Sequence, residues 1–284
     1  MYMKLLKIIS FIVTIAFFST NAFAEKCSGF SNSFSITNDV GFGDTYRKSP
    51  VNEFKKHGVC IVNKSEEHPT RLGEQALRFE VKPGDCGYSR SWSDCKNDRE
   101  RHELKGHNHQ GENWYMWSVF LPKNFQNVYP TKLSFFQFKQ IKNGKPVWMI
   151  QNYNGGFHID NQVNGYSTLP MGIIILEAKE TINKWNDMVV NSNWTVSKDG
   201  FFRLWVNGKL ILNHSGPTMS KGNKVHVKFG VYRSFLSRFK DNNRLDKVPG
   251  QVVYFDEVRT GKTCKKLKLE ELGYNCKDLL VSQN

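Results

Sequence analysis

The sequence predicts an all-β protein, either a β-sandwich or a jelly roll. Ten or more short β-prone runs are separated by turn-forming residues, and helical periodicity is almost absent. The clearest run, KVHVKFGVYRS at 224–234, alternates apolar residues with polar ones. Period-two alternation indicates a strand with one buried and one exposed face. We expect the function to lie on the exposed face, where Gly230 leaves room beside three functional groups, those of His226, Lys228 and Tyr232.

The first 24 residues have the composition of a secretory signal. Lys4 and Lys7 precede an apolar stretch at 5–18, and Ala22-Phe23-Ala24 offers a small-x-small cleavage site. The apolar stretch is too short to indicate a spanning helix. We therefore expect a secreted or periplasmic protein. Residues 25–284 should form one domain, since no linker, repeat or low-complexity tract divides them.

The chain is strongly basic. Cleavage after residue 24 removes Lys4 and Lys7 but no acidic residue, so the net charge falls only from +14 to +12. Such a surplus attracts nucleic acid, anionic lipid or acidic polysaccharide. Export and the lack of a recognised nucleic-acid motif argue against the first, and no second apolar run approaches membrane length. We expect a monomer whose partner is an anionic polysaccharide.

All six cysteines follow the predicted cleavage site. An even number in an exported chain favours disulfides, and the absence of Cys-x-x-Cys argues against zinc or thioredoxin-like chemistry. Sequence proximity suggests three bridges: Cys86–Cys95, Cys264–Cys276 and, by remainder, Cys27–Cys60.

Strands in the first half are bounded by turn residues. Residues 25–70 are turn-rich, with one short strand expected at 59–62, and the strand at 75–82 ends at Pro83-Gly84-Asp85. The next strands are expected at 98–105, 114–121, 132–140 and 147–153. Alternation within 132–140 places Phe136 and Phe138 on one face, and the other face is expected to hold Phe135, Gln137 and Lys139.

Strands in the second half are expected at 171–178, 185–196, 201–212, 224–233 and 251–259. The run 201–212 contains Asn207-Gly208, a strong hairpin signal. A short helix is expected at 267–272. Tryptophans of a sandwich are usually buried, so we place three of them in the core: Trp117, Trp148 and Trp205.

Eight segments carry a family resemblance. They are GEQALRFEV at 73–81, RHEL at 101–104, WSVFLP at 117–122, FQFK at 136–139, DG at 199–200, LWVNGK at 204–209, KFGVYR at 228–233 and VYFDEV at 253–258. Together and in this order they resemble the polysaccharide lyase family that includes heparin lyase I and glucuronan lyases. The resemblance implies a concanavalin-like β-jelly roll with a substrate groove across its concave sheet.

Lyases of this kind cleave a uronic-acid polysaccharide by β-elimination. A cation or hydrogen-bond donor neutralises the uronate carboxyl, a base removes the adjacent C5 proton, and an acid protonates the leaving glycosidic oxygen. No cofactor is required. Asp256 is the residue that we consider for a structural Ca²⁺, as acidic residues hold this ion in some concanavalin-like folds.

Tyr232 is the candidate acid, and in some sugar geometries a tyrosine serves as base as well. A phenol normally titrates near a pKa of about 10, and a cation on the same face, such as Lys228, lowers that value. The Lys-x-x-x-Tyr spacing matches the pair that the family places in its active site. The alternative is a tyrosine at the rim of a sheet with no catalytic role.

Substrate contacts are predicted on neighbouring strands. Arg101 is expected to hold a uronate or sulfate with two hydrogen bonds while Glu103 orients it, and Gln137 is expected to donate to the carboxylate. The alternative is a cross-strand ion pair and a solvated polar side chain. His226 is expected to contact a distal sugar, and Arg233 is counted with the substrate-binding residues.

The position of the base departs from the family pattern. Related lyases use a histidine where this chain has Lys139, which serves as a base if its pKa is depressed and otherwise binds anions. Other candidates are His226, His158 in a loop or strand start, and His102, which shares a face with Leu104 and fits the core better. The replaced histidine also supports a second hypothesis, a non-catalytic lectin-like jelly roll for acidic glycans.

Overall fold

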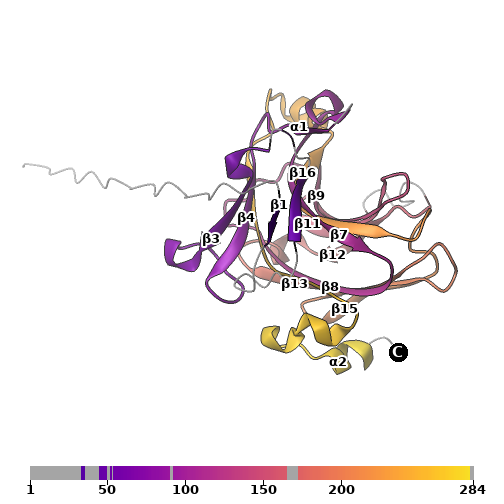
Figure 1. The fold of residues 1–284 in the computed structure, drawn as a ribbon. Helices are drawn as coiled ribbons and strands as arrows, with labels where there is room; N and C mark the ends of the chain where they lie inside the picture. Colours follow the sequence, from indigo (N-terminus) through magenta and orange to yellow (C-terminus); the bar gives the residue numbers. More distant parts are fainter. Residues whose placement is uncertain are drawn as a thin grey trace, which may run out of the picture.

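The computed structural model describes residues 33–35, 45–49, 52, 54–89, 92–164 and 172–281. The predicted signal sequence lies outside the described residues. The chain folds into two large antiparallel sheets packed as a sandwich (Figure 1), which confirms the predicted all-β jelly roll. Within these residues no helix is long and apolar enough to span a membrane.

One sheet has eight strands. In spatial order they are β1 (Ser33–Ser35), β2 (Thr45–Ser49), β7 (Arg99–His109), β16 (Val225–Ser234), β9 (Lys132–Gln140), β10 (Pro146–Tyr153), β11 (Gly156–Asn161) and β12 (Ile173–Leu176). The sequence did not predict β1 or β2, and it left β11 as a loop or strand start. The short runs of β1 and β2 lack apolar alternation, so tertiary pairing determines them rather than local pattern.

The other sheet has seven strands. In spatial order they are β15 (Lys209–Ser215), β14 (Phe201–Val206), β13 (Trp185–Trp194), β8 (Gly111–Phe120), β17 (Gln251–Gly261), β4 (Gln75–Val81) and β3 (Val59–Asn63). The β14–β15 turn is the one that Asn-Gly predicted, with positive φ at Asn207 (49°) and Gly208 (80°). A third, two-stranded sheet pairs β5 (Tyr88–Ser89) with β6 (Trp92–Ser93).

Helical segments are short. The α-helices are α1 (Leu236–Asn243) and α2 (Cys276–Val281). The 3₁₀ turns are η2 (Lys56–Gly58), η3 (Lys64–Glu66), η4 (Cys95–Asn97), η5 (Ala178–Glu180), η6 (Cys264–Leu267) and η7 (Leu269–Leu272). The single helix expected at 267–272 is wrong, because Lys268 adopts a φ of 49° and separates η6 from η7.

Aromatic side chains form the core between the sheets. The rings of Trp117 and Phe136 stack across the interface with centroids 3.8 Å apart, and Phe79 meets Phe229 edge-on at 5.7 Å. Burying each ring contributes about 1.5–3 kcal/mol. The three tryptophans predicted to be buried are buried, Trp205 beneath the C-terminal segment rather than between the sheets.

The C-terminal segment covers the outer face of the seven-stranded sheet (Figure 1). Its leucines pack against Trp114 and Trp205, and the predicted Cys264–Cys276 disulfide joins η6 to α2. The predicted Cys86–Cys95 disulfide is also present. Cys60 is disulfide-bonded too, and its expected partner, Cys27, lies outside the described residues.

A bulge interrupts β16 and β9 at the same level. The pairing register shifts between Phe229 and Tyr232, and Phe135 turns into the core instead of facing outward as the alternation predicted. Gly230 has a φ of 132°, and a Cβ there would lie against His102 O and 2.7 Å from Phe79 Cδ1. The position that a Cβ would occupy at Gly230 therefore faces the core. We had expected it to face the polar side of the strand.

Gly230→Ala should destabilise the protein by about 2 kcal/mol, because it combines backbone strain with a clash against the core. Urea unfolding measures the loss. The matched control is Gly84→Ala, where φ is 87° but no atom lies within 4 Å of the added Cβ, so its cost should be smaller. Equal costs for the two variants would contradict a packing role for Gly230.

Candidate active site

Five predicted site residues meet on the outer face of the eight-stranded sheet. Arg101 and Glu103 come from β7, Lys228 and Tyr232 from β16, and Gln137 from β9. The register pairs Tyr232 with Arg101 and Lys228 with Gln137, so cross-strand neighbours share the face. We call these five residues the central cluster.

Glu103 lies at the middle of the central cluster and is 1% exposed. Its carboxylate accepts hydrogen bonds from Lys228 Nζ at 2.5 Å, from Gln137 Nε2, and from Arg101 Nη1 at 3.4 Å. Burial lowers the pKa of Lys228 to about 8, and the charge of Glu103 opposes that shift. Lys228 and Gln137 thus direct donors at Glu103, whereas Gln137 was expected to point a donor at substrate.

Arg101 is held by Asp94, a buried residue that no sequence motif singled out. Its Nε donates to Asp94 Oδ2 at 2.8 Å, and its Nη2 donates to Asp94 Oδ1. The guanidinium edge expected to grip a uronate with two hydrogen bonds is therefore already occupied. Arg101 Cζ lies 4.1 Å from the centroid of the Tyr232 ring, so its charge acts on Tyr232 through the ring face.

The Tyr232 hydroxyl accepts a hydrogen bond from Arg99 Nε at 2.7 Å. Burial raises the pKa of this phenol, while the cations Arg101 and Arg99 act in the opposite direction. The sequence assigned this cationic influence to Lys228, but Lys228 pairs with Glu103. Because Arg99 is the donor, the phenol keeps its own proton for another acceptor.

Lys139 is half-buried on β9, and no carboxylate in the described part of the chain pairs with its ammonium. Burial lowers its pKa, Glu103 opposes this, and Arg101 and Lys105 lower it further. An ammonium without a counter-ion is suited to binding a carboxylate, and its lowered pKa also suits a base.

The three candidate histidines lie in different places. His226 pairs with Lys139 across β16 and β9, and burial, helped by Lys105 and Lys228, lowers its pKa to about 3. It is therefore neutral. His158 lies on β11, three strands from β16, or about 14 Å at the usual strand spacing. His102 faces the core, as predicted, and hydrogen-bonds Glu80 O through Nδ1 at 2.6 Å.

Arg233 does not reach this face. As the neighbour of Tyr232 in a strand it points to the opposite side, where it is completely buried. Its Nε donates to Glu100 Oε2 at 2.6 Å and its Nη1 to Pro249 O at 2.5 Å. The structure therefore makes Arg233 part of the internal packing and not a substrate ligand.

Two places in the described part of the chain hold side chains that could bind a metal ion. Among the described residues, His57, Asp85 and His102 lie close together, but Nδ1 of His102 bonds Glu80 O and its Nε2 accepts from Lys55 N. That leaves too few free ligands for an ion.

Asp256, considered for Ca²⁺, does not fit either. Its oxygens accept backbone N–H groups of Arg71, Leu72 and Glu257, whereas Ca²⁺ requires six to eight oxygen ligands. We therefore assign no metal to these residues.

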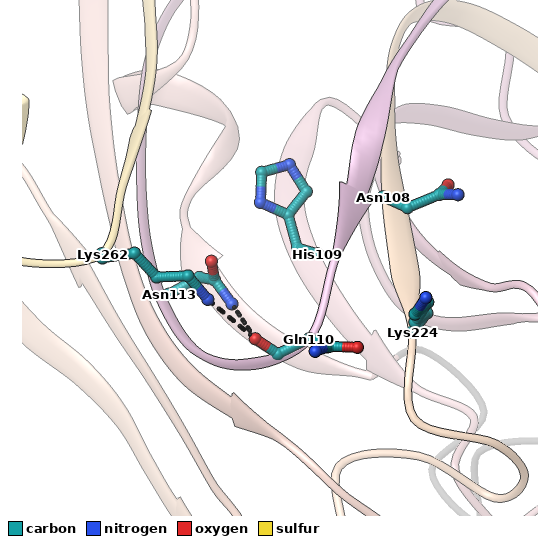
Figure 2. Close-up of a pocket in the computed structure, with 6 residues that line it drawn as sticks. All are labelled: Asn108, His109, Gln110, Asn113, Lys224 and Lys262. Atoms are coloured by element: carbon teal, nitrogen blue, oxygen red, sulfur yellow. Dashed lines mark hydrogen bonds between the residues drawn. The ribbon is translucent and has the colours of Figure 1, made fainter.

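A polar hollow of about 330 Å³ lies at the other end of β16 from Tyr232. Figure 2 shows it between the β7–β8 turn, Lys224 and Lys262. Lys262 Nζ donates to Gln110 O at 2.9 Å, as does Asn113 Nδ2. No residue of the central cluster lines this hollow.

Three residues beside Tyr232 were not found from the sequence. Asp94 and Trp92 belong to the Cys86–Cys95 loop, and Arg99 begins β7. Arg99 Cζ lies 5.3 Å from the Trp92 ring, which is 42% exposed and can stack on a sugar. The available signal in the sequence was the predicted Cys86–Cys95 disulfide, because it closes this loop shortly before β7 begins.

Glu103→Gln should destabilise the protein by about 3 kcal/mol, because it leaves the Lys228 ammonium buried without its counter-charge. Urea denaturation at pH 7 measures the change. The control Glu74→Gln removes the partner of Lys64 (4.0 Å) from an ion pair whose side chains are 62% and 77% exposed, and should cost much less. A Glu103→Gln variant as stable as the parent would contradict this ion pair.

Comparisons with known proteins identify the family and the fold. The polysaccharide lyase family matches residues 60–259. No curated protein matches the chain. Among solved structures, the endo-β-1,4-glucuronan lyase of the fungus Trichoderma reesei is 18% identical with a TM-score of 0.53, covering 76% of this chain and 91% of that one.

Two further solved structures resemble the chain. A glycoside hydrolase family 131 catalytic domain from Coprinopsis cinerea is 12% identical with a TM-score of 0.50, covering 77% of this chain and 84% of that one. The alginate lyase of Corynebacterium sp. is 13% identical with a TM-score of 0.46, covering 66% and 76%. Likeness at these identities shows the fold alone. The family match spans most of the chain, which therefore belongs to the polysaccharide lyase family.

Proposed function

We propose that this lyase is secreted and cleaves a uronic-acid-containing anionic polysaccharide by β-elimination, with Tyr232 as the acid. The observation that carries the proposal is the Arg99 hydrogen bond to the Tyr232 hydroxyl. This bond leaves the phenol proton pointing elsewhere, on the face where Lys139 lacks a counter-ion. A proton donor beside an unpaired cation is what elimination from a uronate requires.

Tyr232 is protonated at neutral pH because burial raises its pKa. As the C4–O4 bond breaks and the C4=C5 bond forms, the phenol gives its proton to the leaving oxygen. The resulting phenolate faces Arg101 across its ring and Arg99 at its oxygen. In a sugar whose C5 hydrogen and leaving group share one side, Tyr232 serves as base and acid in turn: its phenolate form, held by Arg99 and Arg101, first takes the C5 proton and then gives that proton to the leaving O4.

Lys139 and the second N–H of Arg101 Nη1, the nitrogen that also donates to Glu103, are the groups proposed to neutralise the uronate carboxyl. Both side chains are partly exposed. Neutral His226 lies beside Lys139 and supplies a hydrogen-bonding group for a neighbouring sugar. Lys228 and Glu103 act by fixing the positions of these groups rather than by touching substrate.

Charge and cysteine use support the substrate class and the location. The net charge of the exported chain favours a polyanion. Disulfides are typical of proteins outside the cytoplasm, and the predicted signal sequence agrees with export. The Trichoderma reesei structure is a glucuronan lyase, so glucuronan is the first substrate to test, followed by alginate, heparan sulfate and heparin.

Tyr232→Phe should abolish formation of the unsaturated uronate while leaving the Kd for the polymer within about threefold of the parent, because binding rests on other residues. Ultraviolet absorbance of the product measures turnover, and calorimetry measures binding. Tyr274→Phe is the control: it too removes a bonded phenol, but one that donates to Asp187 on the other sheet. Full turnover in Tyr232→Phe would show that another residue is the acid.

Lys139→Gln should raise KM on the order of tenfold and lower kcat by about the same factor while leaving measurable turnover, because the ammonium binds the carboxylate in the ground state and also stabilises the added negative charge that the carboxylate takes up as the C5 proton leaves. Lys139→His tests the base directly, and a rise in kcat would indicate that a histidine restores a lost base. If Lys139→Gln instead abolishes kcat at unchanged KM, Lys139 itself takes the C5 proton.

A further inference from the structure

Arg99 is fixed from several sides. Its Nη1 donates to Asn97 O, and its guanidinium lies 5.3 Å from the centroid of Trp92 and 5.5 Å from that of Phe235. The remaining Nε–H meets the Tyr232 hydroxyl at 2.7 Å. A guanidinium restrained in this way delivers one donor in one direction.

We propose that Arg99 is a positioning residue that orients the proton of Tyr232 toward the substrate and stabilises the phenolate left when that proton is transferred. The inference rests on the proposed acid role of Tyr232 and assigns the group that makes it work. The electron pair of the C4–O4 bond leaves with O4, O4 takes the Tyr232 proton, and the C5 proton goes to the base. The negative charge then lies on the phenol oxygen, against Arg99.

The other charges that face Tyr232 are balanced. Arg101 acts through the ring, but its charge is offset by Asp94, with which it shares two hydrogen bonds. Glu103 is offset by Lys228 on the same strand as Tyr232. Across the strand pair, β9 presents the neutral Ser134.

Arg99, in contrast, has no carboxylate partner among the residues that the structure describes. Its charge is therefore directed at the phenol oxygen without compensation. Removing Asp94 or Glu103 would unbalance a pair, whereas removing Arg99 takes away the cation that faces the oxygen itself.

The Cys86–Cys95 loop holds both arginines. Trp92 packs on Arg99, and Trp92 Nε1 donates to Asp94 Oδ1 at 3.0 Å, while Asp94 in turn holds Arg101. One disulfide-closed loop thus sets the positions of the two cations that flank Tyr232.

The decisive experiment is an NMR titration of the Tyr232 phenol, with tyrosine labelled at ¹³Cζ and the signal assigned by its loss in Tyr232→Phe. In Arg99→Gln the phenol pKa should rise by about one unit or more, because the facing cation is gone. Arg99→Lys, which keeps the charge without the fixed fork, should give a smaller rise. Arg203→Gln is the control, since Arg203 also lies over an aromatic ring (Phe201, 4.2 Å) but on the other sheet.

Kinetics provide the second measurement. In Arg99→Gln, kcat should fall on the order of tenfold and the alkaline limb of its pH profile should move upward with the phenol, which a merely structural role would not cause. An unchanged titration of Tyr232 in both Arg99 variants overturns the inference. The titration needs no substrate, so it decides the role of Arg99 even if Tyr232→Phe retains turnover and the proposed acid is wrong.

Discussion

The site depends on the ion pair and hydrogen bonds made by the buried carboxylate of Glu103. Donors from three strands converge on it: Arg101 from its own strand β7, Lys228 from β16 and Gln137 from β9. A carboxylate buried this deeply is tolerated only when its oxygens are satisfied, so the cluster holds the three strands in one register. If the register of one of these strands shifted by one residue, the side chain that this strand contributes to the cluster would point into the aromatic core.

Charge pairing explains which residues remain available for substrate. Glu103 takes Lys228, and Asp94 takes the bidentate edge of Arg101. Arg99 and Lys139 are left without carboxylate partners among the described residues, one facing the phenol and the other facing outward on β9. The polar face of β16 therefore carries the neutral Lys228–Glu103 pair at its centre. The cations of Arg99 and Lys139 lie around this pair without carboxylate partners among the described residues.

Sequence reasoning found the strands whose apolar residues alternate regularly, such as 75–81 and 225–234, because period two follows directly from burial of one face. It failed where pairing or a bulge overrides the pattern. β2 has no apolar alternation, and Phe135 turns inward at the bulge beside Gly230. Neither feature has a local signal, since each depends on a partner strand distant in the chain.

The site showed the same division. The motif located the central cluster, because Lys-x-x-x-Tyr fixes a spacing along one strand. It did not reveal Asp94 or Arg99, whose roles come from a loop folded against β7, and it wrongly included Arg233, which alternation alone places on the buried side. Within a strand, a residue next to a candidate site residue in the sequence points to the opposite face, so adjacency is a poor guide to the site.

The fold alone does not determine the chemistry, since a glycoside hydrolase of Coprinopsis cinerea shares it. In the proposed reaction, a uronate is cleaved over the central cluster. A crystal structure of the Tyr232→Phe variant with a bound oligouronide tests this most directly. We expect one carboxylate to contact Lys139 and Arg101, with the adjoining glycosidic oxygen beside the ring of residue 232. An oligouronide bound instead in the hollow between Lys224 and Lys262, with the central cluster empty, would contradict the claim.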